Sequence, residues 1–185
     1  MEITFLEEAT MVLNVEENRL RKENKLHKKD SCVDYFSMPY VFLALHVANC
    51  TSNEYLQNEC LKRLMSSKPV MDTIMYRVDN YYGYYGCEQL QFIYDDVSKD
   101  EFTVFCWEAV REHLKKFDAS IYDFPRTSAG ELDMSYKSFE KRLTAGIFKI
   151  CKWAYKDFLK EKCQERGLML DGNHLSSYAM IRKVC

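Results

Sequence analysis

Apolar residues recur along most of the chain with the three- to four-residue spacing of amphipathic helices. A period-two alternation, which would indicate a half-buried strand, does not persist anywhere. The clearest apolar stripe consists of Phe102, Phe105, Cys106, Ala109, Leu114 and Phe117. The pattern therefore predicts an all-α protein with little or no strand.

Helix start and stop signals divide this pattern into segments. Two capping boxes are predicted, at Thr51/Glu54 and Ser98/Glu101. In a capping box the hydroxyl and the carboxylate, three residues apart, each accept a hydrogen bond from the other residue's backbone amide. The expected helices cover residues 5–28, 34–49, 51–65, 69–81, 90–97, 98–117, 135–144, 147–166 and 175–184. Residues 124–134, with Pro125 and Gly130, are expected to form a loop. We predict a single helical bundle of about eight to ten helices.

Length and composition fit one such bundle. The 185 residues lie in the range of a single domain, and 47% of them are hydrophobic, enough to fill a core. Only 6 Gly and 3 Pro interrupt the helical pattern. The expected organisation is a partly charged N-terminal helix at 1–30, a bundle core at 31–170 and a short C-terminal helix or tail at 171–185.

Several features point to a cytoplasmic or nuclear protein. The N-terminal segment carries Glu2, Glu7 and Glu8 where a secretory signal peptide has basic residues. The longest apolar run, 40–47, is too short to cross a bilayer, so no transmembrane segment is expected. The 8 Cys are scattered along the helical pattern, which favours free thiols in a reducing compartment.

The charge pattern does not favour a nucleic-acid partner, because the formal net charge is −2. The richest basic stretch consists of Arg19, Arg21, Lys22, Lys25, Lys28 and Lys29. We interpret it as a solvated helix face, with an anionic membrane or nucleic-acid patch as the alternative.

No stretch of the sequence carries a complete catalytic, cofactor or metal motif. His46 and Cys50 have the four-residue spacing of two metal ligands on a helix, but no further pair completes a zinc site. The loop around Gly130 lacks the first and last carboxylates of a calcium loop. We therefore expect no cofactor, no metal and no enzyme activity. The alternative is a cysteine-dependent enzyme built on Cys106 or Cys151.

The most unusual segment is Tyr81-Tyr82-Gly83-Tyr84-Tyr85-Gly86, in which two glycines bracket an aromatic turn. Tyrosines supply rigid contact area and a hydroxyl, so protein-binding surfaces favour them. The alternative is a turn whose rings cover the edge of the core. On the binding interpretation, the partner-contacting residues are Tyr82, Tyr84, Tyr85, Glu88 and Gln89.

From about residue 60 to 160, the order of features resembles the RGS (regulator of G-protein signalling) family of helical domains. The stretch Gly86-Cys87-Glu88-Gln89-Leu90-Gln91-Phe92-Ile93 is similar to the family's Ser-Glu-Glu-Asn-Leu-x-Phe-Trp run. Ile121-Tyr122-Asp123-Phe124, Leu132-Asp133 and Tyr155-Lys156-Asp157-Phe158-Leu159 resemble three later family motifs.

This resemblance implies an RGS-like bundle that acts as an adaptor or regulator of signalling, with a G-protein α subunit or another signalling component as partner. The family's contact Asn residues are replaced by Gln89 and Glu131, which argues against GTPase activation. The alternative fold is Bcl-2-like, the fold of inhibitors of apoptosis or innate immune signalling, including viral ones, that bind a partner helix in a groove. Its central helix would be 102–117 or 147–159, although the family's Asn-Trp-Gly-Arg signature is absent.

Overall fold

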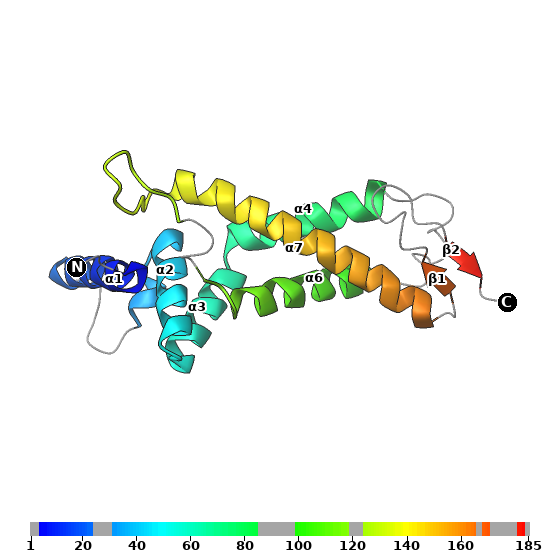
Figure 1. Cartoon of the computed structure of the whole chain (residues 1–185), viewed down its shortest axis with the longest axis horizontal. Helices are drawn as coiled ribbons and strands as arrows, with labels where there is room; N and C mark the ends of the chain where they lie inside the picture. The colour runs from blue at the N-terminus through cyan, green and yellow to red at the C-terminus, as the bar shows by residue number, and fades with distance from the viewer. Residues whose placement is uncertain are drawn as a thin grey trace. The chain divides into compact units, whose positions relative to one another are not determined.

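The computed structural model describes residues 4–23, 31–84, 99–118, 124–165, 168–170 and 181–183, and these are mostly helical (Figure 1). Their elements are α1 (Phe5–Lys22), η1 (Cys32–Asp34), α2 (Met38–Cys50), α3 (Glu54–Met65), α4 (Lys68–Tyr84), α6 (Lys99–Leu114), α7 (Tyr136–Glu165), β1 (Leu168–Leu170) and β2 (Ile181–Lys183). The predicted predominance of helix is confirmed.

The chain forms two compact units. Unit 1 comprises Met1–Val70 and Arg111–Thr144, and unit 2 comprises Met71–Val110 and Ala145–Cys185. Three helices, α4, α6 and α7, contribute residues to both units. The expected boundaries at residues 30 and 170 remain predictions.

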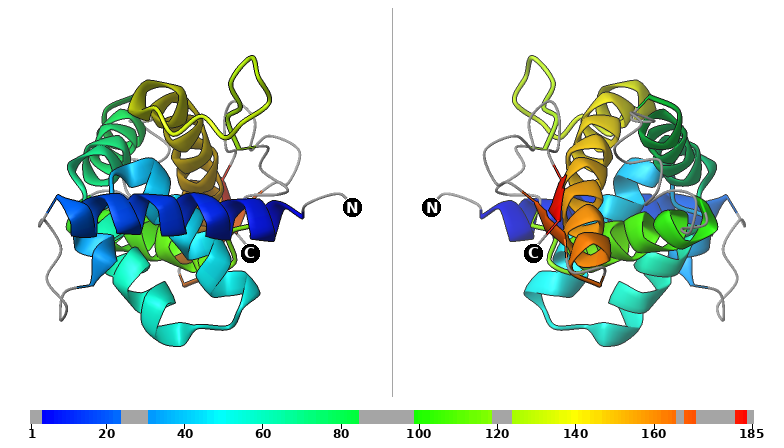
Figure 2. Two further views of the ribbon diagram at one scale, coloured as in Figure 1. Left: turned by 90° about the vertical axis from the view of Figure 1, so that its left-hand side faces the viewer. Right: turned by 90° about the vertical axis from the view of Figure 1, so that its right-hand side faces the viewer.

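Unit 1 is organised around α2, which is buried on nearly every side. Its buried residues are Pro39, Val41, Phe42, Leu43, Ala44, Leu45, His46 and Ala48. A helix that is apolar all round has to lie inside a core, and α1 and α3 both pack against α2 (Figure 2). The Asn49 amide donates to the Phe117 carbonyl at 2.9 Å, which ties the residues after α6 to this core.

Unit 2 has an aromatic core contributed by α4, α6 and α7, which are labelled in Figure 1. The Tyr81 ring stacks on the Tyr155 ring with 4.5 Å between centroids and 9° between planes. Phe102 meets Tyr155 edge-on and lies 5.0 Å from the Phe158 ring. These four side chains are all buried, including Tyr155, which the predicted apolar stripe of 147–166 did not include.

Two predicted helix starts are wrong. α2 begins at Met38 after Ser37, whereas Asp34 lies in η1. The capping box at Thr51/Glu54 does not form, because the Asn53 side chain caps α3 by accepting from the Leu56 amide at 3.1 Å. The Thr51 hydroxyl donates back to the Val47 carbonyl at 2.7 Å. Neighbouring cap-forming residues compete for the same role, and the local pattern does not decide between them.

Two predicted helix ends lie too far along the chain. α1 ends at Lys22 rather than residue 28, with Glu23 as its C-cap. α6 ends at Leu114 rather than residue 117, and the Phe117 amide closes a turn onto the Leu114 carbonyl at 3.0 Å. Helix ends commonly fray into such turns.

The two helices predicted at 135–144 and 147–166 are one helix, α7. Gly146, which lies between the two predicted segments, is helical, and a Cβ added there would meet nothing within 4 Å. Leu143, Ile147 and Ile150 are all buried, so the apolar stripe passes through the glycine without interruption. Burial of that stripe outweighs the cost of about 1 kcal/mol that glycine adds to a helix.

The predicted C-terminal helix at 175–184 is wrong for residues 181–183. These form β2, which pairs antiparallel with β1 so that Met169 faces Arg182. Three residues are too few for an alternating pattern to be recognised in the sequence.

Candidate interaction site

The tyrosine-rich segment is partly helical. α4 continues through Tyr84, so Gly83 lies inside a helix and the predicted turn at this point is wrong. The Tyr81 side chain is only 6% exposed, which confirms the core-edge interpretation for this residue. Tyr82 and Tyr84 lie in the last turn of α4.

The other three predicted contact residues, Tyr85, Glu88 and Gln89, lie outside the described residues. Their role in binding, and that of Tyr82 and Tyr84, remains a prediction.

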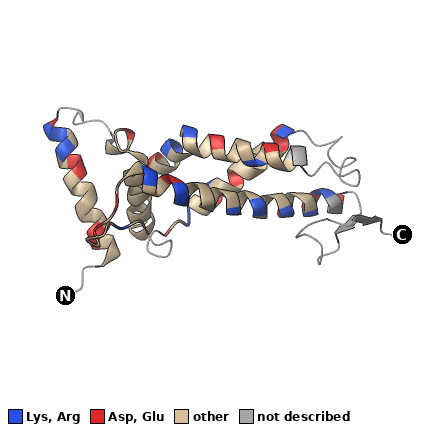
Figure 3. Ribbon diagram, turned by 90° about the horizontal axis from the view of Figure 1, so that it is seen from above, with Lys and Arg blue, Asp and Glu red and all other residues tan. Residues whose placement is uncertain are grey.

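The outward side of α7 in unit 2 carries a basic face, which consists of Lys149, Lys152, Trp153, Lys156 and Lys160. At 3.6 residues per turn, its four lysines fall within an arc of about 80° and extend roughly 16 Å along the axis. Figure 3 shows blue positions recurring along one edge of this helix. None of the four lysines forms an ion pair with any described residue. This face was not predicted from the sequence, although the helical spacing of its lysines indicates it.

Trp153 lies within the basic face and is 47% exposed. The Lys149 ammonium sits 5.0 Å from its ring centroid, a cation–π contact that holds the indole at the surface. Nearby, Tyr76 of α4 is 58% exposed and stacks on Phe148 at 5.9 Å. Aromatic side chains that are partly exposed can supply contact area at a protein interface.

The basic stretch predicted near the N-terminus is largely neutralised within α1. Arg19 pairs with Glu16 and Glu23, each at 2.6 Å, and Arg21 pairs with Glu17 at 2.5 Å. These contacts favour the solvated-helix interpretation for the described half of the stretch. Lys25, Lys28 and Lys29 lie outside the described residues.

Cys106 and Cys151, the two candidate nucleophiles, lie together inside unit 2. Both are 0% exposed. Interaction with Cys151 and burial raise the pKa of Cys106. Interaction with Cys106 lowers the pKa of Cys151, and the positive charge of Arg77 acts in the same direction. The two residues are 45 positions apart, so no local pattern could have shown that both lie in one core.

His46 lies in a second cluster, inside unit 1. It is 2% exposed, its Nδ1 lies 3.4 Å from the Asp118 carboxylate, and the Phe5 ring meets it edge-on at 5.0 Å. The Cys50 Sγ lies 3.8 Å from Nδ1 and 3.7 Å from Nε2, so it is aligned with neither nitrogen. Burial and Asp118 also raise the pKa of Cys50, so this pair lacks the features of an activated nucleophile. Within the described ranges no group of three or more His, Cys, Asp or Glu is placed to hold a metal ion.

We expect His46 to make the protein less stable in mild acid. Burial holds the His46 pKa below its ordinary value, despite the opposing Asp118 carboxylate. The unfolded chain therefore binds the proton more readily, so this contribution to stability is present above about pH 6.5 and is lost as the pH falls below it. The slope of the unfolding free energy should be at most about 1.4 kcal/mol per pH unit for this one proton. Urea unfolding between pH 8 and pH 5 measures this slope. His46→Gln should flatten the dependence of the unfolding free energy on pH. An unchanged slope in this variant would exclude His46 as its source.

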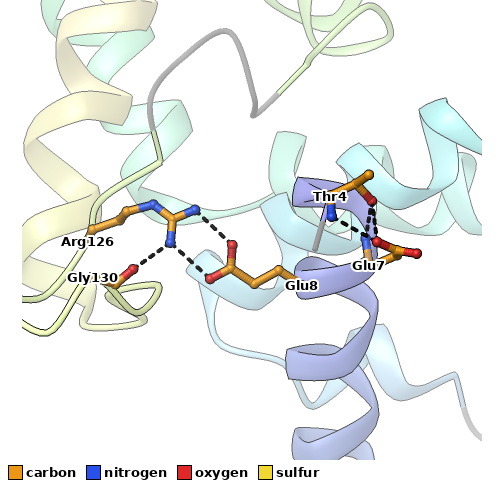
Figure 4. A network of polar contacts seen from close by, with 5 residues as sticks. All are labelled: Thr4, Glu7, Glu8, Arg126 and Gly130. Atoms are coloured by element: carbon orange, nitrogen blue, oxygen red, sulfur yellow. Dashed lines mark hydrogen bonds and ion pairs between the residues drawn. The ribbon is translucent and has the colours of Figure 1, made fainter. Parts of the chain in front are cut away.

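The loop at 124–134 is confirmed and is anchored to α1. Arg126 makes a bidentate ion pair with Glu8, with 2.9 Å from Nη1 to Oε1 and 2.8 Å from Nη2 to Oε2 (Figure 4). Its Nη1 also donates to the Gly130 carbonyl at 2.6 Å. Gly130 has a φ of +83°, a conformation that side chains disfavour. Beside this contact, an unpredicted capping box of Thr4 and Glu7 starts α1. The loop is therefore a defined surface feature of unit 1.

Comparison with known proteins does not assign the chain to a family, because no family model, curated protein or solved structure matches it. Among the described helices, none is both long enough and apolar enough to cross a membrane.

Proposed function

We propose that this protein is a non-enzymatic interaction module, an adaptor or regulator of signalling, that binds an acidic surface of another protein through unit 2. The observation that carries the proposal is the basic face of α7, in which an exposed tryptophan lies among four lysines without described acidic partners. We also infer a cytoplasmic or nuclear location. It is supported by Cys32, Cys50, Cys60, Cys106 and Cys151, all of which are free.

Lysine and tryptophan contribute differently to such an interface. Lysines at the rim attract an acidic partner and speed association, whereas they add little affinity once they are solvated. A large aromatic ring that becomes fully buried supplies most of the binding energy in typical interfaces. Trp153 is the natural anchor because it is already ordered by Lys149 and thus loses little freedom on binding.

The tyrosines at the end of α4 would extend this surface. Tyr81 fixes the end of α4 against Tyr155 of α7 in the core of unit 2. The predicted contact residues Tyr82, Tyr84, Tyr85, Glu88 and Gln89 follow that anchor directly. We therefore include them in the proposed binding surface.

The finer proposal is a divergent RGS-like module, with a G-protein α subunit or an associated signalling component as partner. It rests on the order of the sequence motifs. The Bcl-2-like reading has no comparable support, because no observation favours a groove for a partner helix. Against a cysteine-dependent enzyme, the two candidate thiols are 0% exposed and out of a substrate's reach.

The proposal predicts that charge reversal on α7 weakens partner binding. A purified G-protein α subunit and a death-motif helix serve as the two probes, each titrated against the full chain by calorimetry. Lys149→Glu with Lys156→Glu should weaken binding to the α subunit at least tenfold, because both charges would repel an acidic surface. Trp153→Ala should weaken it by a similar factor, and Tyr84→Ala with Tyr85→Ala should weaken it without unfolding the domain.

The matched control is Lys62→Glu with Arg63→Glu, which makes the same charge change on the exposed side of α3 in unit 1. This variant should bind like the original protein. Equal losses in both charge variants would show that only net charge matters and would contradict the proposed face. Binding to the death-motif helix alone would favour the Bcl-2-like alternative. Binding to neither probe would contradict both the RGS-like and the Bcl-2-like hypotheses.

A further inference from the structure

A second exposed surface of unit 2 carries the opposite charge to the basic face of α7. This acidic stripe consists of Asp100, Val104 and Glu108 on α6, and all three residues are exposed. They are spaced four apart and therefore follow one another along the same side of the helix. Phe102 and Cys106 lie on the other side of α6 and are buried. Neither carboxylate of the stripe forms an ion pair or a hydrogen bond with any described residue, so both charges are available to a partner.

The acidic stripe and the basic face each carry an apolar residue between their charges. Val104 lies midway between the two carboxylates and is 56% exposed, and Trp153 lies between Lys149 and Lys156 and is 47% exposed. By helix rise, the two carboxylate residues are about 12 Å apart and the two lysines about 10 Å apart. The flexible lysine side chains easily cover this difference, so the two surfaces match in spacing as well as in charge.

Within one molecule, α6 and α7 contact each other through other residues. The Phe102 ring of α6 lies 5.0 Å from the Phe158 ring of α7, and Lys162 pairs with Glu101 at 2.5 Å. The acidic stripe lies on the side of α6 opposite Phe102, and the basic face lies on the side of α7 opposite Phe158. Both surfaces therefore point away from this contact and remain open to another molecule. Since the formal net charge is only −2, two copies of the chain repel each other little.

We propose that a second copy of this chain binds to the basic face of α7 through its acidic stripe. In this contact Trp153 covers Val104, and lysines on either side of Trp153 pair with Asp100 and Glu108. The contact joins two different surfaces, so each copy keeps one of each kind available and association continues beyond a dimer as the concentration rises. The inference rests on the proposed function in that both use the face of α7. Self-association would compete with the signalling partner and so regulate access to that face.

This contact should be weak and sensitive to salt. Two single helix faces bury less surface than the roughly 1,600 Å² of a standard interface. Exposed charge pairs add little affinity and are screened by salt, so the burial of Trp153 is the main favourable contribution. The chain should therefore be monomeric when dilute and should associate when concentrated.

Sedimentation equilibrium of the full chain tests the proposal. In about 50 mM salt, the weight-average mass should rise with concentration to at least about 1.5 times the monomer mass, and about 500 mM salt should reverse the rise. Lys149→Glu with Lys156→Glu should stay monomeric, and so should Asp100→Lys with Glu108→Lys. An equimolar mixture of these two variants should associate again, because each surface of one variant is then opposite in charge to a surface of the other.

The matched control is Glu54→Lys with Glu131→Lys, which makes the same charge change as the acidic-stripe variant at exposed positions of unit 1. This control should associate like the original protein. A chain that stays monomeric at every concentration would overturn the proposal. So would an equal loss of association in the control, or a mixture of the two reversed variants that stays monomeric.

A cross-linking measurement needs no variant and therefore decides the question even if a variant fails to fold. Isotope-labelled and unlabelled copies of the original protein are mixed and treated with a carbodiimide, which joins a lysine amine to a nearby carboxylate. Mass spectrometry should show peptides that join a lysine of the basic face in one copy to Asp100 or Glu108 in the other. Links between copies that involve only other residues would overturn the proposed contact.

Titration with the G-protein α subunit separates this inference from the proposed function. Asp100→Lys with Glu108→Lys should bind that probe at least as tightly as the original protein, because its α7 face is intact and no longer occupied by a second copy. A monomeric chain in which Lys149→Glu with Lys156→Glu still weakens binding of the probe would overturn the self-association alone. Association through both surfaces without binding of the probe would support the self-association and contradict the proposed partner.

Discussion

Phe102→Ala is expected to lower the free energy of unfolding by about 3–5 kcal/mol, a large part of the 5–15 kcal/mol that stabilises a typical domain. Phe102 is 1% exposed and contacts the rings of Tyr81, Tyr155 and Phe158, which come from the two other long helices of unit 2. Alanine would leave a cavity that three rigid neighbouring rings cannot fill. Urea denaturation followed by circular dichroism measures the change.

Val104→Ala is the matched control for this prediction. Val104 lies two residues further along α6 and is 56% exposed, so its truncation should change stability by no more than about 0.5 kcal/mol. Similar losses in the two variants would show that α6 does not face the core as described.

Gly146→Pro should destabilise the protein by about 3 kcal/mol or more, because it interrupts α7 in its middle. Proline lacks the amide hydrogen that a helix needs at this position, and its ring would clash with the carbonyl of Arg142 one turn earlier. By contrast, Gly146→Ala should stabilise by about 0.5–1 kcal/mol, since the glycine is helical and an added Cβ has open space. Thermal unfolding of the two variants against the unmodified protein provides the measurement.

The two variants at residue 146 together test whether α7 is continuous. If the chain instead broke between residues 144 and 147, as its local sequence predicted, proline would be tolerated and alanine would bring no gain. A neutral effect of proline would therefore contradict the single 30-residue helix.

The candidate binding surface was only partly predictable from the sequence. The composition of the tyrosine-rich segment predicted either a binding surface or the edge of the core. Tyr81 is a core residue. The basic face lies opposite Ile150, Ala154 and Phe158, which the apolar pattern predicts to face inward and which are buried in unit 2. What the spacing of the lysines does not reveal is whether acidic side chains of other helices lie beside them.

Apolar periodicity alone predicted that the chain is helical and many of the residues that face inward. Val78, Phe102 and Ile147 are buried, because a helix repeats every 3.6 residues and each stripe is set by neighbours within a few turns. In the stripe that includes Phe102, however, Phe105, Ala109 and Phe117 are only half-buried. The loop at 124–134 was also predictable from the local sequence, because Pro125 and Gly130 interrupt the helical pattern there.

The tertiary structure decided the helix ends, the continuity of α7 and the pairing of distant residues. Asn49 reaches a carbonyl 68 residues away, and Glu8 pairs with Arg126 across 118 residues. Such contacts depend on how the helices pack against one another. The short-range pattern of a single sequence does not determine that packing. For this reason the sequence predicted a helical protein, whereas only the packed structure shows which distant residues meet.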